Sequence, residues 1–171
     1  MRNVQKRSGR GGFSLLEVAV ATILIAVGLT ALLVAVGANT RVNDAGRKLT
    51  DATFLTQEVR EWTLSLPFSD PDPWDANSPP GPDGTDPQVF VDDLDDLMNV
   101  TYAPPRDGQG NVIAHMIAWG QTITLTWRDP NNLTQSVADG TSDIIHVNVD
   151  VTHAGETVLS ADWLVARRRQ E

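Results

Sequence analysis

The chain begins with an apolar stretch that is longer than a buried core helix needs. From Phe13 to Ala38 only Glu17 is charged, and the 21 residues of 18–38 carry no charge at all. An α-helix of that length extends roughly 31 Å, which matches the hydrocarbon core of a bilayer. A secretory signal peptide has a shorter apolar region of about 7–15 residues, followed by a cleavage site of small residues. The pattern therefore predicts a membrane-spanning helix over 13–38.

The helical pattern continues through residues 39–66 as an amphipathic segment. Apolar residues recur there at intervals of three or four, the spacing of one helix face, with polar residues on the other sides. This apolar stripe consists of Val42, Ala45, Leu49, Ala52, Leu55, Val59, Trp62 and Leu66. Pro67 then ends the pattern. We expect one continuous helix from about Ser14 to Leu66, whose second half packs against a globular domain.

Residues 67–110 have the composition of a loop region. The part from 67 to 87 contains seven prolines and five aspartates, which excludes a helix or an inner strand. A calcium site in this region is an alternative, based on Asp70, Asp72 and Asp75. Their spacing differs from that of an EF-hand loop. The acidic run 92–96 (DDLDD) fits either a short helical turn or the edge of a strand.

In residues 111–171 the period of the pattern changes to two, which is typical of strands. Apolar residues alternate with polar ones in 121–127 and 143–151, and a third run, 157–166, follows a short turn. We expect three or four antiparallel strands with one apolar face that receives the amphipathic helix. The predicted fold class is α+β: a long N-terminal helix, transmembrane in its first half, packed on a small antiparallel sheet.

The charge distribution adds a membrane orientation. The formal net charge is −9, but residues 1–12 carry four positive charges and no acid, so the rest has 9 Lys and Arg against 22 Asp and Glu, a net −13. Positive charge before a membrane span places the N-terminus in the cytoplasm and the body outside. The acidic body argues against binding nucleic acid. Because the chain has no cysteine, thiolate metal sites and thiol nucleophiles are excluded.

Glu17 is costly inside a membrane helix unless it finds a partner or lies near the interface. It belongs to a compound pattern: a basic leader, a glycine, the run GFSLLEV (12–18), and then an unbroken apolar stretch. In this pattern the chain resembles the type IV pilin-like proteins, which comprise pilins, minor pilins and the pseudopilins of type II secretion. The strand ITLTWRD (123–129) is also similar to one of PilV-like minor pilins.

The resemblance implies how the chain is processed. A prepilin peptidase would remove the leader 1–12 by cleaving between Gly12 and Phe13, and the new amino terminus on Phe13 would be methylated. Glu17 would pair with the terminal amine of a neighbouring subunit and fix the axial register of a fibre. The implied partners are the peptidase, other pilin or pseudopilin subunits and the inner-membrane assembly platform.

The chain is thus expected to be a structural subunit of a type IV pilus or a type II secretion-type filament, and a minor rather than a major one. It would reside in the inner membrane as a single-span protein before it joins a periplasmic or extracellular filament. No catalytic motif stands out, so we expect neither an enzyme nor a cofactor. The alternative is a single-span membrane protein whose exported β-domain binds a ligand or acts as an enzyme.

Overall fold

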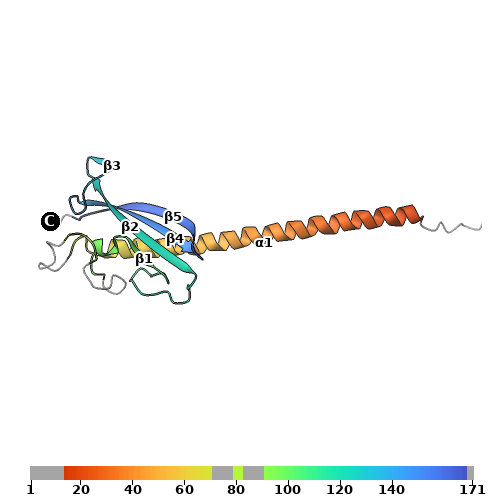
Figure 1. Cartoon of the computed structure of the whole chain (residues 1–171), viewed down its shortest axis with the longest axis horizontal. Coiled ribbons are helices and arrows are strands. Elements are labelled where there is room, and N and C mark those ends of the chain that lie inside the picture. Colours follow the sequence, from red (N-terminus) through yellow and green to blue (C-terminus); the bar gives the residue numbers. More distant parts are fainter. Residues whose placement is uncertain (1–13, 71–78, 83–90, 169–171) are drawn as a thin grey trace, which may run out of the picture. The chain divides into compact units, whose positions relative to one another are not determined.

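The computed structural model describes residues 14–70, 79–82 and 91–168. Its elements follow one another along the chain as a long helix, one turn of 3₁₀-helix and five strands (Figure 1). They are α1 (Leu15–Ser65), η1 (Asp95–Leu97), β1 (Val100–Tyr102), β2 (Trp119–Asp129), β3 (Asn132–Ser136), β4 (Ile144–His153) and β5 (Glu156–Ala166). The predicted long helix is confirmed, with bounds one residue inside those expected.

The chain divides into two compact units, residues 1–45 and 46–171. In the first unit the described residues are one exposed stretch of α1, preceded by Ser14. The second unit contains the rest of α1 and all five strands. Every residue of the apolar core lies in this second unit.

The sheet is antiparallel throughout, with the order β1-β2-β4-β5 and β3 paired to β2 beside that path. Along β4, buried and half-buried residues alternate, as the period of two in the sequence predicts. One face therefore carries the apolar side chains and the other carries Thr, Asn, His and Asp. The predicted α+β class is confirmed, and the three or four strands expected in 111–171 are four, β2 to β5, while β1 lies before that region.

The core forms where one face of α1 meets the apolar face of the sheet. The buried helix residues are Ala52, Leu55, Thr56, Val59, Trp62 and Thr63. Two side chains of the sheet also bond the helix directly. Gln121, fully buried, donates from Nε2 to the backbone oxygen of Leu55 at 3.0 Å, and Trp163 donates from Nε1 to the hydroxyl of Thr63 at 3.2 Å.

Two sequence predictions need adjustment. The apolar stripe of the helix is buried only from Ala52 onward, since Val42 is 69% exposed and Leu49 is 50% exposed. The region 67–110, predicted as a loop, contains η1 and the short strand β1, which pairs with residues 121–123 in the first half of β2. A strand of three residues is too short to show an alternating pattern, and its pairing with β2 decides its structure.

Trp62 joins the helix to the loop that follows β1. Its ring lies 5.6 Å from that of Tyr102, measured between centroids. Gly110 (φ +79°) packs against the same ring so closely that a Cβ there would lie 2.8 Å from Trp62. Nearby, the N–H of Gly108 donates to Glu58 Oε2 at 2.6 Å, which fastens the loop to α1.

Replacing Trp62 by alanine should lower the free energy of unfolding by about 3–5 kcal/mol, because it removes a large buried side chain and leaves a cavity. Urea unfolding of the full chain in detergent, followed by circular dichroism, measures the change. Leu64→Ala is the matched control, because Leu64 lies on the same helix but is 47% exposed. It should change the stability by about 0.5 kcal/mol or less. Equal losses in the two variants would contradict the assignment of Trp62 to the core.

Candidate functional site

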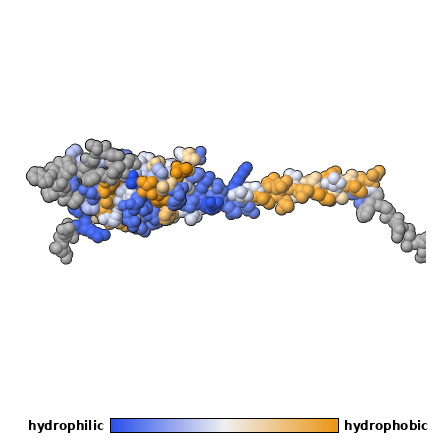
Figure 2. Space-filling model, turned by 90° about the horizontal axis from the view of Figure 1, so that it is seen from below, coloured by the Kyte–Doolittle hydropathy of each residue, from blue (hydrophilic) through white to orange (hydrophobic). Residues whose placement is uncertain are grey.

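The first part of α1 presents apolar side chains to its surroundings on all sides. From Leu15 to Ala45 every residue is exposed, including large ones such as Leu33 at 72% and Leu24 at 66%. Figure 2 shows the N-terminal part of the helix as a largely apolar surface that gives way to hydrophilic residues further along the helix. In length and composition the helix is sufficient to cross a membrane. A soluble helix would need a covering for such a surface.

The polar side chains within residues 18–38 find their hydrogen-bond partners inside the helix itself. Between 18 and 38 the only polar side chains are those of Thr22 and Thr30. Each hydroxyl donates to the backbone oxygen four residues earlier, Thr22 to Val18 and Thr30 to Ala26, both at 2.8 Å. In a bilayer every polar group must find its partner internally. The segment meets that requirement without a neighbour.

Glu17 lies in the first turn of α1, and its backbone N–H takes part in the cap of the helix. Ser14 directly precedes the helix, and its hydroxyl oxygen accepts a hydrogen bond from the N–H of Glu17 at 3.2 Å. Serine at this position with glutamate three residues later is the capping-box pattern. A carboxylate in the first turn also interacts favourably with the positive end of the helix dipole. Part of the preference for glutamate at 17 therefore comes from helix initiation alone.

The predicted processing residues cannot be placed beside this cap. Gly12 and Phe13 lie outside the described residues, so the cleavage site and the terminal amine are not part of the structure. Glu17 itself is exposed. Its predicted pairing with a neighbouring amine stays a prediction. The capping box, which the sequence analysis did not consider, was readable in the sequence as S-x-x-E over 14–17.

The acidic run 92–96 folds around η1. Of the two structures that the sequence left open, a short helical turn and the edge of a strand, it forms the helical turn. Asp93 is 1% exposed, and its Oδ1 accepts hydrogen bonds from the N–H groups of Asp95 at 2.8 Å and Asp96 at 3.2 Å. Asp96, fully buried, likewise accepts from the N–H of Asp92 at 2.9 Å. Asp95 in turn accepts from the N–H of Gly81 at 2.7 Å. These carboxylates serve to close the turn.

Burial raises the pKa of Asp93 to about 7, and the charge of Asp95 beside it contributes in the same direction. Burial is also the main cause that raises the pKa values of Asp92 and Asp95. Between the ordinary value of 3.8 and about 7, the folded chain retains a proton on Asp93 that the unfolded chain has released. The free energy of unfolding should therefore fall as the pH rises through this range.

Asp93→Asn should remove much of that pH dependence and raise the stability above pH 7 by on the order of 2 kcal/mol. The amide oxygen of asparagine can accept the same two backbone hydrogen bonds, so the turn is preserved. Urea unfolding at a series of pH values measures the effect. The control is Asp129→Asn, which should leave the dependence of stability on pH unchanged. Asp129 Oδ1 accepts a hydrogen bond from the N–H of Asn131 at 2.8 Å in an exposed turn. An unchanged profile in Asp93→Asn would contradict the assignment.

No metal site emerges from the described residues. Within 14–70, 79–82 and 91–168 no group of three or more His, Asp or Glu side chains is arranged to hold an ion. Of the three aspartates for which a calcium site was left open, Asp72 and Asp75 lie outside the described residues.

His146 points away from the apolar face, as its position in the alternation predicts, and its Nε2 lies 3.0 Å from Asp162 Oδ2.

Comparison with known proteins finds no family model, no curated protein and no solved structure that matches this chain. What the chain does must therefore be inferred from its own residues. Those residues combine an exposed apolar helix of membrane length with a capped, acidic first turn, and a separate α+β unit with its own core.

Proposed function

We propose that this chain is a structural subunit, a minor pilin or pseudopilin, of a type IV pilus or a type II secretion-type filament. A prepilin peptidase cleaves it between Gly12 and Phe13, and the subunit is assembled from the inner membrane. In the membrane its N-terminus is cytoplasmic and its body is exported. In the filament the apolar part of α1 packs against the same part of neighbouring subunits.

The observation that carries this proposal is the single helix Leu15–Ser65, which begins within the motif 12–18 that resembles a processing site. A plain membrane anchor explains the apolar stretch but gives no reason for the leader, the glycine and Glu17 to occur together. A filament subunit needs both a helix that can leave the bilayer and a means of setting its register. A buried ion pair between Glu17 and a neighbouring amine sets register better than it adds stability.

The proposal is tested by following the chain into filaments. Filaments sheared from cells, or drawn from a secretion system that overproduces them, should contain the processed chain at low abundance. The same fraction from cells that lack the assembly platform should contain none, while the processed chain accumulates in the membrane. A chain that stays in the membrane whether or not the platform is present would contradict the proposal.

A further inference from the structure

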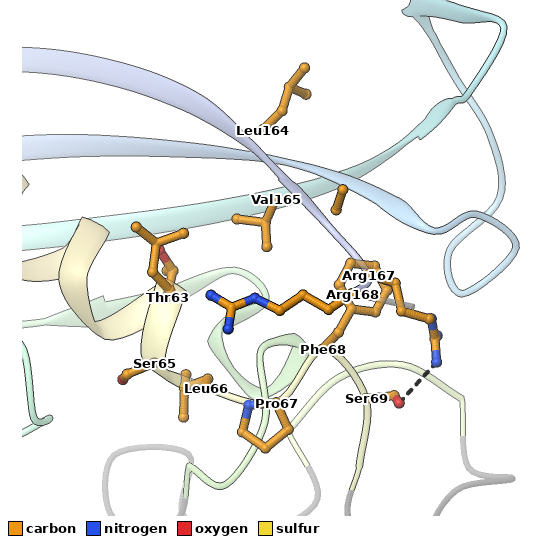
Figure 3. Close-up of a pocket in the computed structure, with 12 residues that line it drawn as sticks. Thr63, Ser65, Leu66, Pro67, Phe68, Ser69, Leu164, Val165, Arg167 and Arg168 are labelled. Atoms are coloured by element: carbon orange, nitrogen blue, oxygen red, sulfur yellow. Dashed lines mark hydrogen bonds between the residues drawn. The ribbon is translucent and has the colours of Figure 1, made fainter. Parts of the chain in front are cut away.

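A groove of about 830 Å³ lies in the second unit, where the end of α1 faces the end of β5. One wall consists of residues 63–69, the last turn of the helix and the segment after it, and the other consists of residues 164–168. Figure 3 shows Val165 and Leu66 facing the space between these walls. The groove thus lies directly beside a strand that has a free side.

β5 is the last strand of the sheet, and among the described strands only β4 pairs with it. In an antiparallel sheet, the N–H and C=O groups of every second residue of an edge strand point away from the neighbouring strand. They are therefore available to pair with another strand. The opposite edge of the sheet is formed by β1, which has three residues, and β3, which has five. β5 therefore offers the longer row of backbone groups for pairing.

Natural edge strands usually carry features that prevent pairing, such as proline, lysine or a bulge. From Leu159 to Ala166 β5 has none of these. The register shift between β4 and β5 occurs before Leu159, beside the turn. The only charged side chain in this stretch, Asp162, is directed to His146 on the outer face of the sheet. The edge is open to another strand along this stretch.

Three arginines follow the strand, and the two within the described residues, Arg167 and Arg168, differ in their contacts. Arg167 forms an ion pair with Asp143 at 2.9 Å, donates to Ser69 Oγ at 3.1 Å and lies 4.7 Å above the ring of Phe68. Arg168 has no hydrogen-bond or ion-pair partner among the described residues. Figure 3 shows its guanidinium extending into the groove, in the direction of Thr63. Arg167, Arg168 and Arg169 make this end of the chain locally positive although its net charge is −9.

We propose that the open edge of β5 and the adjacent groove bind an extended, acidic segment of another protein chain. The segment adds to the sheet as an antiparallel strand through backbone hydrogen bonds. Its alternate apolar side chains enter the groove beside Val165 and Leu66, and one of its carboxylates meets Arg168. A second copy is not the expected donor, because its acidic run 92–96 is held in the turn around η1. Its other acidic stretch, 67–87, contains seven prolines, which lack the N–H that a pairing strand donates. The proposed filament function is not required for this site.

The probe is a fluorescein-labelled peptide of the sequence Thr-Glu-Thr-Val-Thr-Val-Thr, in which the glutamate and the two valines lie on the same face of a strand, added to the full chain in a neutral detergent. Fluorescence anisotropy measures its affinity. One control peptide has lysine in place of glutamate, and the other has proline in place of valine, which removes backbone donors but keeps the charge. The glutamate peptide should bind more tightly than either control and should slow amide hydrogen exchange in residues 163–166.

Arg168→Glu should weaken binding of the glutamate peptide by roughly three- to fivefold, the range of a solvent-accessible charge pair, and should strengthen binding of the lysine peptide. Arg47→Glu, the same change at an exposed arginine of α1, should alter neither affinity. The proposal is overturned if the proline peptide binds as well as the glutamate peptide, or if Arg168→Glu and Arg47→Glu have equal effects. Self-association of the peptide-free chain through β5, seen as protection of residues 163–166 that rises with protein concentration, would overturn it in favour of a second copy.

Discussion

Glu17→Gln should reduce incorporation of the chain into filaments by roughly tenfold or more, while removal of residues 1–12 continues normally. Removing one member of a buried ion pair leaves the other charge unpaired, which costs about 3–5 kcal/mol. In the proposed filament that unpaired charge is the terminal amine of Phe13. The measurement compares the amounts of processed chain in the filament and membrane fractions.

Glutamine is the informative substitution because residue 17 is also the third residue of a helix that Ser14 caps. Glutamine at the third position of a helix can complete a capping box just as glutamate does, so Glu17→Gln removes the charge and keeps the cap. Ser14→Ala does the reverse, since it removes the hydroxyl that accepts from the N–H of Glu17 and keeps the carboxylate. Losing such a cap costs about 1 kcal/mol of helix stability.

The two variants therefore separate assembly from helix initiation. The ion-pair hypothesis expects a large loss of incorporation in Glu17→Gln and a small one in Ser14→Ala. If Glu17→Gln assembles like the native chain while Ser14→Ala does not, Glu17 serves the cap and the ion-pair hypothesis is wrong.

Gly12→Val should abolish removal of the leader and thereby exclude the chain from filaments. The proposed peptidase cleaves directly after this glycine, and a branched side chain there would stand next to the scissile bond. Gly11→Val is the matched control, since it makes the same substitution one residue earlier and should be processed normally. Both variants are expressed with the cognate peptidase and compared by electrophoretic mobility. Equal processing of the two would remove Gly12 from the proposed site.

The helix was predictable because each of its features is local. Its start follows from a serine cap, its end from Pro67, and its apolar length from an uninterrupted run of residues. β2, β4 and β5 were predictable for a similar reason, since each is long enough to show a period of two. A short turn joins β4 to β5, whereas the connection between the neighbours β2 and β4 passes through β3, which pairs with β2 as well.

The features that sequence reasoning missed depend on distant contacts. Gln121 is fully buried although it is polar, because α1 and the loop after β1 offer it backbone partners at Leu55 and Arg106. β1 exists because residues 100–102 pair with β2. The groove beside β5 exists because the helix and the last strand end close together. None of these contacts leaves a periodic trace in the sequence.

The most direct test of the proposed function is the intact mass and N-terminal sequence of the native chain, produced together with its prepilin peptidase. The filament-subunit proposal predicts loss of residues 1–12 and a chain that begins with methylated Phe13. A chain that still begins with Met1 would contradict it. Glu17 would then be a capping residue near the membrane surface, and the exported unit would be a membrane-anchored domain with a ligand-binding or enzymatic role.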